Sequence, residues 1–259
     1  MADYRNFPAR SGVGARVDTG IDEGLRAYML KVYNLMALGL AITGLAAWGL
    51  YAVSTTGDPT AAAAQFHGVY LTQTGVAIWT SPLRWVIIFA PLAAVFFLSF
   101  RISRMSVQAA QTTFWVYAAL VGASLSMIFL VYTQTSIVRT FFVTAASFGA
   151  LSLYGYTTKR DLSAMGSFMF MGLIGIIIAS IVNIFLASSA LQFAISVIGV
   201  LVFAGLTAYD TQSIKEMYYE GDDGTVAGRK SIMGALRLYL DFINMFMFLA
   251  IAAEQSVRH

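Results

Sequence analysis

The chain has 259 residues, of which 58% are hydrophobic and only 11% are charged. A soluble protein carries about 25% charged residues, and a soluble fold of this length has too little interior to hide so much apolar surface. The composition therefore excludes a soluble globular domain and places most of the chain in lipid. The absence of cysteine excludes disulfides, thiolate zinc sites and cysteine nucleophiles. The net charge of +3 comes without the basic, aromatic-rich runs that bind nucleic acid.

Seven apolar stretches approach or exceed the length of about 20 residues that a membrane-spanning helix needs. Their ranges are 28–53, 83–100, 113–132, 140–157, 163–187, 190–214 and 235–253. This pattern predicts an all-α integral membrane protein with a membrane domain over residues 28–259. Residues 1–27 carry acidic as well as basic side chains, which favours a retained, flexible cytoplasmic tail over a cleaved signal peptide. In the long break at 54–82, the alanines at 61–64 predict a helix on the membrane surface.

The distribution of Lys and Arg predicts the orientation in the membrane, because these residues accumulate on the cytoplasmic side. Three of the sixteen fall on one side of the predicted spans, namely Arg84, Arg139 and Arg258. The other thirteen share the side of the amino terminus, which we therefore expect in the cytoplasm. Seven spans would place the carboxyl terminus outside, whereas a re-entrant last helix would return His259 to the cytoplasm.

Two acidic residues fall inside predicted spans, where an ionised side chain costs a few kcal/mol or more and usually has a function. Asp210 lies in LTAYDTQ near the cytoplasmic end of the sixth span, and Asp241 lies in RLYLDFINMF, four residues after Arg237. Because the two helices run in opposite directions, we expect both carboxylates at similar depth. Arg101, at the end of the second span, is the nearest predicted cation. The loop between the two helices carries Glu220, Asp222 and Asp223 and is expected to be a flexible turn in solvent.

Paired carboxylates about 4 Å apart repel by roughly 4 kcal/mol at an effective dielectric constant of 20. They therefore tend to share a proton and to titrate as a coupled unit. Such a pair could sense pH, carry protons or bind a hard cation such as calcium through oxygen. In the structural alternative, Asp241 pairs with Arg237 at the i, i+4 spacing and has no further role.

The segments AYDTQSIKEMY, LYLDFINMFMFL and KRDLSAMGSFMFMGLIG resemble the transmembrane Bax inhibitor motif family, in its bacterial YccA-like branch. The resemblance extends from about Leu25 onward, and together with the short length of the chain it implies a protein of the bacterial inner membrane. It implies two groups of three helices around a central carboxy-terminal helix, and a pH-sensitive calcium leak with a di-aspartyl sensor and an arginine latch. By this resemblance, Asp210 and Asp241 form the sensor and are possible calcium ligands, and Arg101 is the latch. Ala90 and Ile251 stand where some members pair a glutamate with an arginine.

In the mechanism that these residues suggest, Arg101 bridges the ionised pair and holds the cytoplasmic end closed until protonation weakens the bridge. A shared proton could instead stabilise the closed form. Phe242, Met245 and Phe246 are expected to pack the central helix and could form a dry constriction. No cofactor is expected, and the partners are the bilayer and calcium ions.

Two other functions compete with the leak. Some bacterial relatives are described as regulators of a membrane-anchored AAA protease, which residues 1–27 could engage. An intramembrane aspartyl protease also carries acids on adjacent spans, but residues 238–240 lack its Gly-x-Gly and no proline follows Pro91. The sequence therefore predicts a protein that is not an enzyme.

Overall fold

A computed structural model describes residues 13–66 and 68–257, with side chains described for residues 23–66 and 68–255. The helices are α1 (Val13–Ser54), α2 (Gln73–Trp79), α3 (Leu83–Arg101), α4 (Val107–Leu125), α5 (Ile128–Val131), α6 (Gln134–Thr157), α7 (Ser163–Leu186), α8 (Ser189–Glu216) and α9 (Gly224–Val257). The strands are β1 (Thr55–Thr56), β2 (Ala64–Phe66) and β3 (Val69–Leu71). Among the described residues, seven helical segments are long and apolar enough to cross a membrane. The prediction of an all-α integral membrane protein is confirmed.

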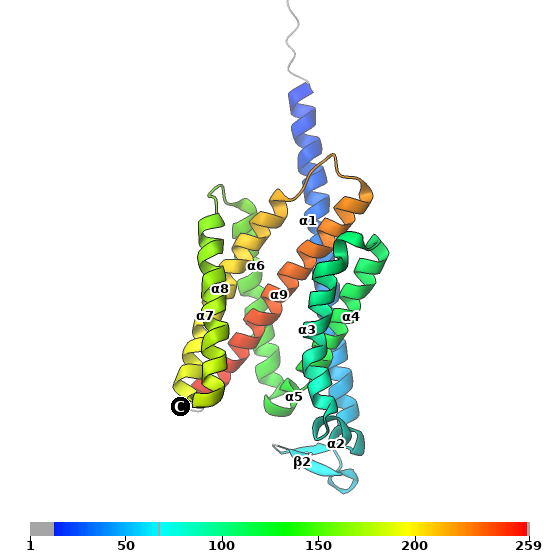
Figure 1. The fold of residues 1–259 in the computed structure, drawn as a ribbon, viewed down its shortest axis with the longest axis vertical. Coiled ribbons are helices and arrows are strands. Elements are labelled where there is room, and N and C mark those ends of the chain that lie inside the picture. Colours follow the sequence, from blue (N-terminus) through cyan, green and yellow to red (C-terminus); the bar gives the residue numbers. More distant parts are fainter. Residues whose placement is uncertain (1–12, 67, 258–259) are drawn as a thin grey trace, which may run out of the picture.

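Helix α9 lies in the middle of the bundle, where it contacts α1, α4, α6 and α8 (Figure 1). On one side of it α1 and α3 pack against α4, and on the other side α6 and α7 pack against α8. Half of the apolar stretch of α9 is buried, whereas only 11% of the corresponding stretches of α3 and α7 are buried. The apolar faces of α3 and α7 are therefore left for lipid, and α9 supplies much of the protein core.

The third predicted span is broken rather than continuous. Helix α4 ends at Leu125, and the short helix α5 resumes at Ile128. At the break, the hydroxyl groups of Ser124 and Ser126 donate hydrogen bonds to the carbonyls of Val121 and Ala123. These bonds compete with the regular backbone ladder of a helix, which the apolar pattern alone does not reveal.

The predicted surface helix over the alanines at 61–64 is wrong. Residues 64–66 form strand β2, which pairs with β3 in a three-stranded antiparallel sheet of order β1-β3-β2. The chain reverses through Gly68, whose φ of +83° favours glycine. The amide of Ala63 donates to the carbonyl of Leu71, so backbone pairing takes the place of a helix. The helical turns in this region are a short 3-10 helix at Pro59–Ala61 and α2, whose first turn is capped by the Thr72 hydroxyl.

The two ends of the chain differ in what the structure describes. Residues 1–12 of the predicted tail lie outside the described residues, and residues 13–27 belong to helix α1 rather than to a flexible segment. Helix α9 is continuous and runs from the end of the bundle at which α1 begins to the opposite end (Figure 1). The last helix is therefore not re-entrant, while His259 itself lies outside the described residues.

Candidate functional site

The structure brings Asp210 of α8 and Asp241 of α9 together. The two helices are antiparallel neighbours joined by the short loop between Glu216 and Gly224. The two side chains lie next to each other between the helices and line the same cavity. Asp241 is only 4% exposed, and its Oδ2 atom has no hydrogen-bond partner among the described residues. The Asp210 side chain is 17% exposed. Asp241 is therefore the more deeply buried of the two acids.

The cation beside this pair is Arg237. Its Nη1 atom lies 3.9 Å from Oδ1 of Asp210 and 3.5 Å from the hydroxyl oxygen of Ser213. Arg237 stands one helical turn before Asp241 on α9, but its ion pair is with Asp210 on the neighbouring helix. The sequence offered Arg237 only as a structural partner of Asp241, because the spacing along one helix does not reveal the register between two helices.

Arg101 lies elsewhere. It is exposed at the end of α3, and in the described part of the chain it forms no ion pair with either aspartate. Helix α3 packs on α4, whereas the aspartates lie on α8 and α9. The latch role of Arg101 stays a prediction, and in this structure Arg237 stands where a latch would be needed.

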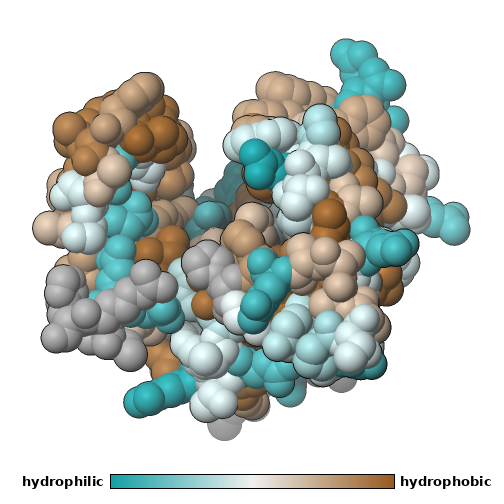
Figure 2. Space-filling view, turned by 90° about the horizontal axis from the view of Figure 1, so that it is seen from below, coloured by the Kyte–Doolittle hydropathy of each residue, from teal (hydrophilic) through white to brown (hydrophobic). Residues whose placement is uncertain are grey.

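A cavity of about 1020 Å³ opens beside the pair, between α7, α8 and α9. Figure 2 shows the molecule deeply hollowed between the lobe that carries α7 and the lobe that carries α3. The polar residues lining the cavity are Ser167, Ser180, Tyr209, Asp210, Arg237, Asp241 and Asn244. Arg237 is the one positively charged residue among the described residues of this lining. The rest of the wall is mostly apolar, so charge is concentrated around the two acids.

The site does not resemble a resident calcium centre. Calcium takes six to eight oxygen ligands, and the described residues contain no group of three or more His, Cys, Asp or Glu side chains that could hold a metal ion. The amide side chains nearest to the acids in sequence are Gln212, which hydrogen-bonds to the backbone of Arg160 and Leu162, and Asn244, whose Nδ2 atom donates to the carbonyl of Leu240. Asp210 and Asp241 alone would leave most of the ligand positions of a calcium ion to water.

An apolar cluster lies on the next turns of α9. Phe242, Met245 and Phe246 are all buried. The ring of Phe242 lies 5.5 Å from that of Phe148 and 5.6 Å from that of Phe141, both on α6, in tilted geometries that favour contact. These residues pack the central helix, and a dry constriction at this level stays a prediction.

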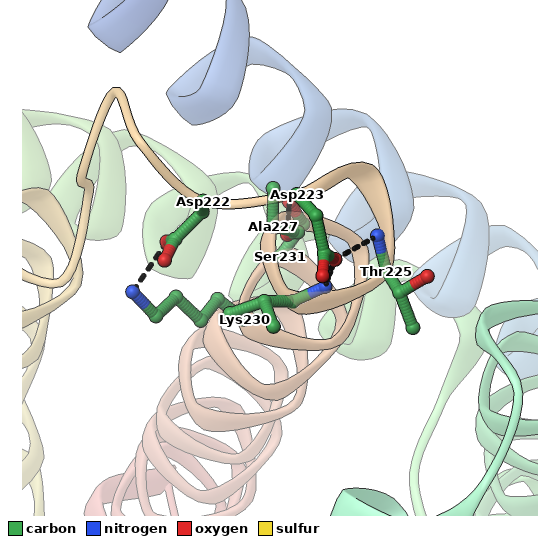
Figure 3. Close-up of polar contacts among 7 residues, drawn as sticks. Asp222, Asp223, Thr225, Ala227, Lys230 and Ser231 are labelled. Atoms are coloured by element: carbon green, nitrogen blue, oxygen red, sulfur yellow. Dashed lines mark hydrogen bonds and ion pairs between the residues drawn. The ribbon is translucent and has the colours of Figure 1, made fainter.

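The loop between the two helices is ordered by its own acids (Figure 3). Asp222 forms an ion pair with Lys230, and Oδ1 of Asp223 accepts hydrogen bonds from the amides of Thr225 and Val226, both 2.8 Å long. Asp223 thereby caps the first turn of α9, where an anion is favoured. Asp223 is exposed, as predicted for a turn in solvent, but each acid has a donor within the following turns of helix. The flexibility of the turn stays a prediction.

The fold and the site thus define a seven-span helical membrane protein with a buried pair of acids between its last two helices. The profile of the family described as inhibitor of apoptosis-promoting Bax1 matches residues 25–256. The chain belongs to this Bax inhibitor family, as the sequence motifs indicated.

Bacterial relatives match nearly the whole chain. An uncharacterized protein of Rickettsia prowazekii, RP147, is 53% identical over 88% of this chain and 89% of its own length. The inner membrane protein YbhL of Escherichia coli K12 is 47% identical over 87% of this chain and 90% of its own. An uncharacterized protein of Caulobacter vibrioides is 45% identical over 96% of each chain.

Proposed function

We propose that this protein is a slow, pH-dependent cation leak of the bacterial inner membrane, with calcium as the favoured ion. The observation that carries the proposal is the contact between Asp210 and Asp241, inside two membrane-spanning helices and beside a single guanidinium. Ionisable groups at such depth are rare and mark ion pathways or proton relays. Membership of the Bax inhibitor family and similarity to an inner membrane protein support the location.

In the proposed mechanism, the charge on the pair sets how firmly α8 is held to α9. When both acids are ionised, Arg237 balances part of their charge and bridges the two helices, and the buried Phe242 cluster keeps the pathway dry. Protonation removes charge from the acids and weakens the bridge to Arg237, so the helices separate more easily. A cation entering the cavity then exchanges water for carboxylate oxygen.

The test is calcium flux by the purified protein in liposomes between about pH 5 and pH 8, a range over which shared protons titrate. Asp210→Asn and Asp241→Asn each remove the titrating pair while keeping the side-chain shape, so each should flatten the pH response. Asp58→Asn is the matched control, because Asp58 is exposed in the loop at the opposite end of the bundle. A wild-type pH response in both variants of the pair would refute the sensor.

A further inference from the structure

The cavity beside the acids continues as a long groove. Its lining on α7 extends from Gly166 to Ile184, which corresponds to about 27 Å of helix at 1.5 Å per residue. The hydrocarbon core of a bilayer is about 30 Å thick. The groove therefore follows the membrane for most of its depth, and it is polar mainly at the end where Arg237 lies.

The wall of this groove suits a hydrocarbon chain better than water. On α7 it presents Phe170, Ile177 and Ile181, each more than half exposed, and α8 and α9 contribute Phe203 and Phe248. Because α7 lies at the outside of the bundle, these side chains meet the lipid phase directly. Lipid filling the groove would keep this apolar surface out of water, at about 25 cal/mol per Å².

Arg237 places a positive charge at one end of the groove, at a depth that a lipid phosphate can reach. Both of its contacts, with Asp210 and Ser213, use Nη1 and are long. The guanidinium has five N–H donors, and the side chain is 42% exposed. Ser213 lies one turn before the end of α8 at Glu216, so the guanidinium reaches the level at which headgroups begin. Arginine binds phosphate oxygens through paired, charge-assisted hydrogen bonds.

We propose that this groove holds one anionic glycerophospholipid, with its phosphate on Arg237 and an acyl chain along α7, α8 and α9. The regulatory part of the proposal rests on the proposed function: the phosphate competes with Asp210 for Arg237 and thereby loosens the bridge between α8 and α9. Binding of the lipid itself does not depend on the leak. Arg237 attracts the phosphate of the headgroup, and the apolar length of the groove selects an acylated ligand over a free anion.

The first test is native mass spectrometry of the full chain with phosphatidylglycerol as the probe. The wild type should retain one phosphatidylglycerol, and Arg237→Gln should weaken retention by about tenfold, as expected for loss of one charge-assisted contact. Arg139→Gln is the charge-matched control, because Arg139 is exposed near the start of α6 and does not line the groove. Equal retention by the wild type and Arg237→Gln would overturn the assignment.

A second pair of variants tests the acyl-chain part without altering charge. Ser180→Trp fills the groove, whereas Ile178→Trp places the same bulk on the neighbouring face of α7, outside the lining. Ser180→Trp should lose the lipid and Ile178→Trp should keep it. Displacement of the lipid by inorganic phosphate alone, or retention by both tryptophan variants, would contradict a seated acyl chain. Mass spectrometry reports bound lipid and does not depend on calcium flux. A failure of the lipid site can therefore be distinguished from a failure of the leak.

Discussion

Asp210 and Asp241 belong to the same pair but have different surroundings. Both acids line the cavity, but Asp210 meets Arg237 at 3.9 Å, whereas Asp241 is only 4% exposed and keeps one oxygen without a hydrogen-bond partner among the described residues. A charge without a partner in a low-dielectric interior is costly. Arg237 therefore balances charge on Asp210 directly, whereas Asp241 has no cation of its own at contact distance among the described residues.

Two variants can test which arginine interacts with the acids. Arg237→Gln removes the charge beside Asp210, so it should change the midpoint or the amplitude of the pH response of calcium flux. Arg101→Gln removes an exposed arginine that has no ion pair to either acid in the described structure, so it should leave the response unchanged. The same flux assay checks both. A response altered only by Arg101→Gln would show that a different conformation, latched by Arg101, controls the gate.

A titrating group outside the spans gives a second prediction at this scale. Hydrogen bonds from the side chain and the backbone of Ser163 hold the pKa of Asp161 below its ordinary value of 3.8. Because the pKa in the folded state is lowered, the stabilisation is present above the unfolded value and is lost as the pH falls through the folded one. Asp161→Ala should therefore lower the melting temperature slightly at neutral pH, and this difference should vanish in strong acid. Thermal melting in detergent at several pH values checks it, and an unchanged difference would contradict it.

Helix packing carries the next prediction, because the backbones of α6 and α8 lie close together at Gly155. A Cβ atom at Gly155 would lie 2.1 Å from the carbonyl oxygen of Ala208, whereas one at Gly149 on the same helix would meet nothing within 4 Å. Gly155→Ala should therefore cost about 1–3 kcal/mol, the usual cost of overpacking, and lower the melting temperature by several degrees. Gly149→Ala should be neutral or slightly stabilising. Equal melting temperatures for the two variants would contradict this account.

The same glycines show what a sequence can and cannot reveal about packing. Gly39 lies near the ring of Phe114 and Gly166 near the ring of Tyr209, but Gly44, Gly49 and Gly175 face open space. The apolar pattern does not distinguish these positions from the tight contact at Gly155. The length of an apolar stretch determines where a span begins and ends, so most boundaries of the predicted spans agree with those in the structure within a few residues. Which face meets which neighbour depends on the register between helices, and that register also explains why Arg237 rather than Arg101 lies at the acids.

At the scale of the whole molecule, the central position of α9 connects these observations. Tyr239 is fully buried and its hydroxyl lies 2.6 Å from that of Thr43 on α1, while Asp241, two residues later, faces α8. One helix therefore links both sides of the bundle. A change in the charge of Asp241 acts on the element that contacts α1, α4, α6 and α8 together, which is how a local protonation could move a whole bundle.

The orientation of the bundle gives the last prediction. The chain contains no cysteine, so single cysteines can be introduced without background. Thr60→Cys lies in the loop before β2, and Ser103→Cys lies at the opposite end, between α3 and α4; both side chains are exposed. Because most Lys and Arg residues share the side of Ser103, an impermeant maleimide should label Thr60→Cys in intact spheroplasts and Ser103→Cys only after permeabilisation. The reverse labelling would place the acids nearer the outer face, where they would meet the pH outside the cell instead of the cytoplasmic pH.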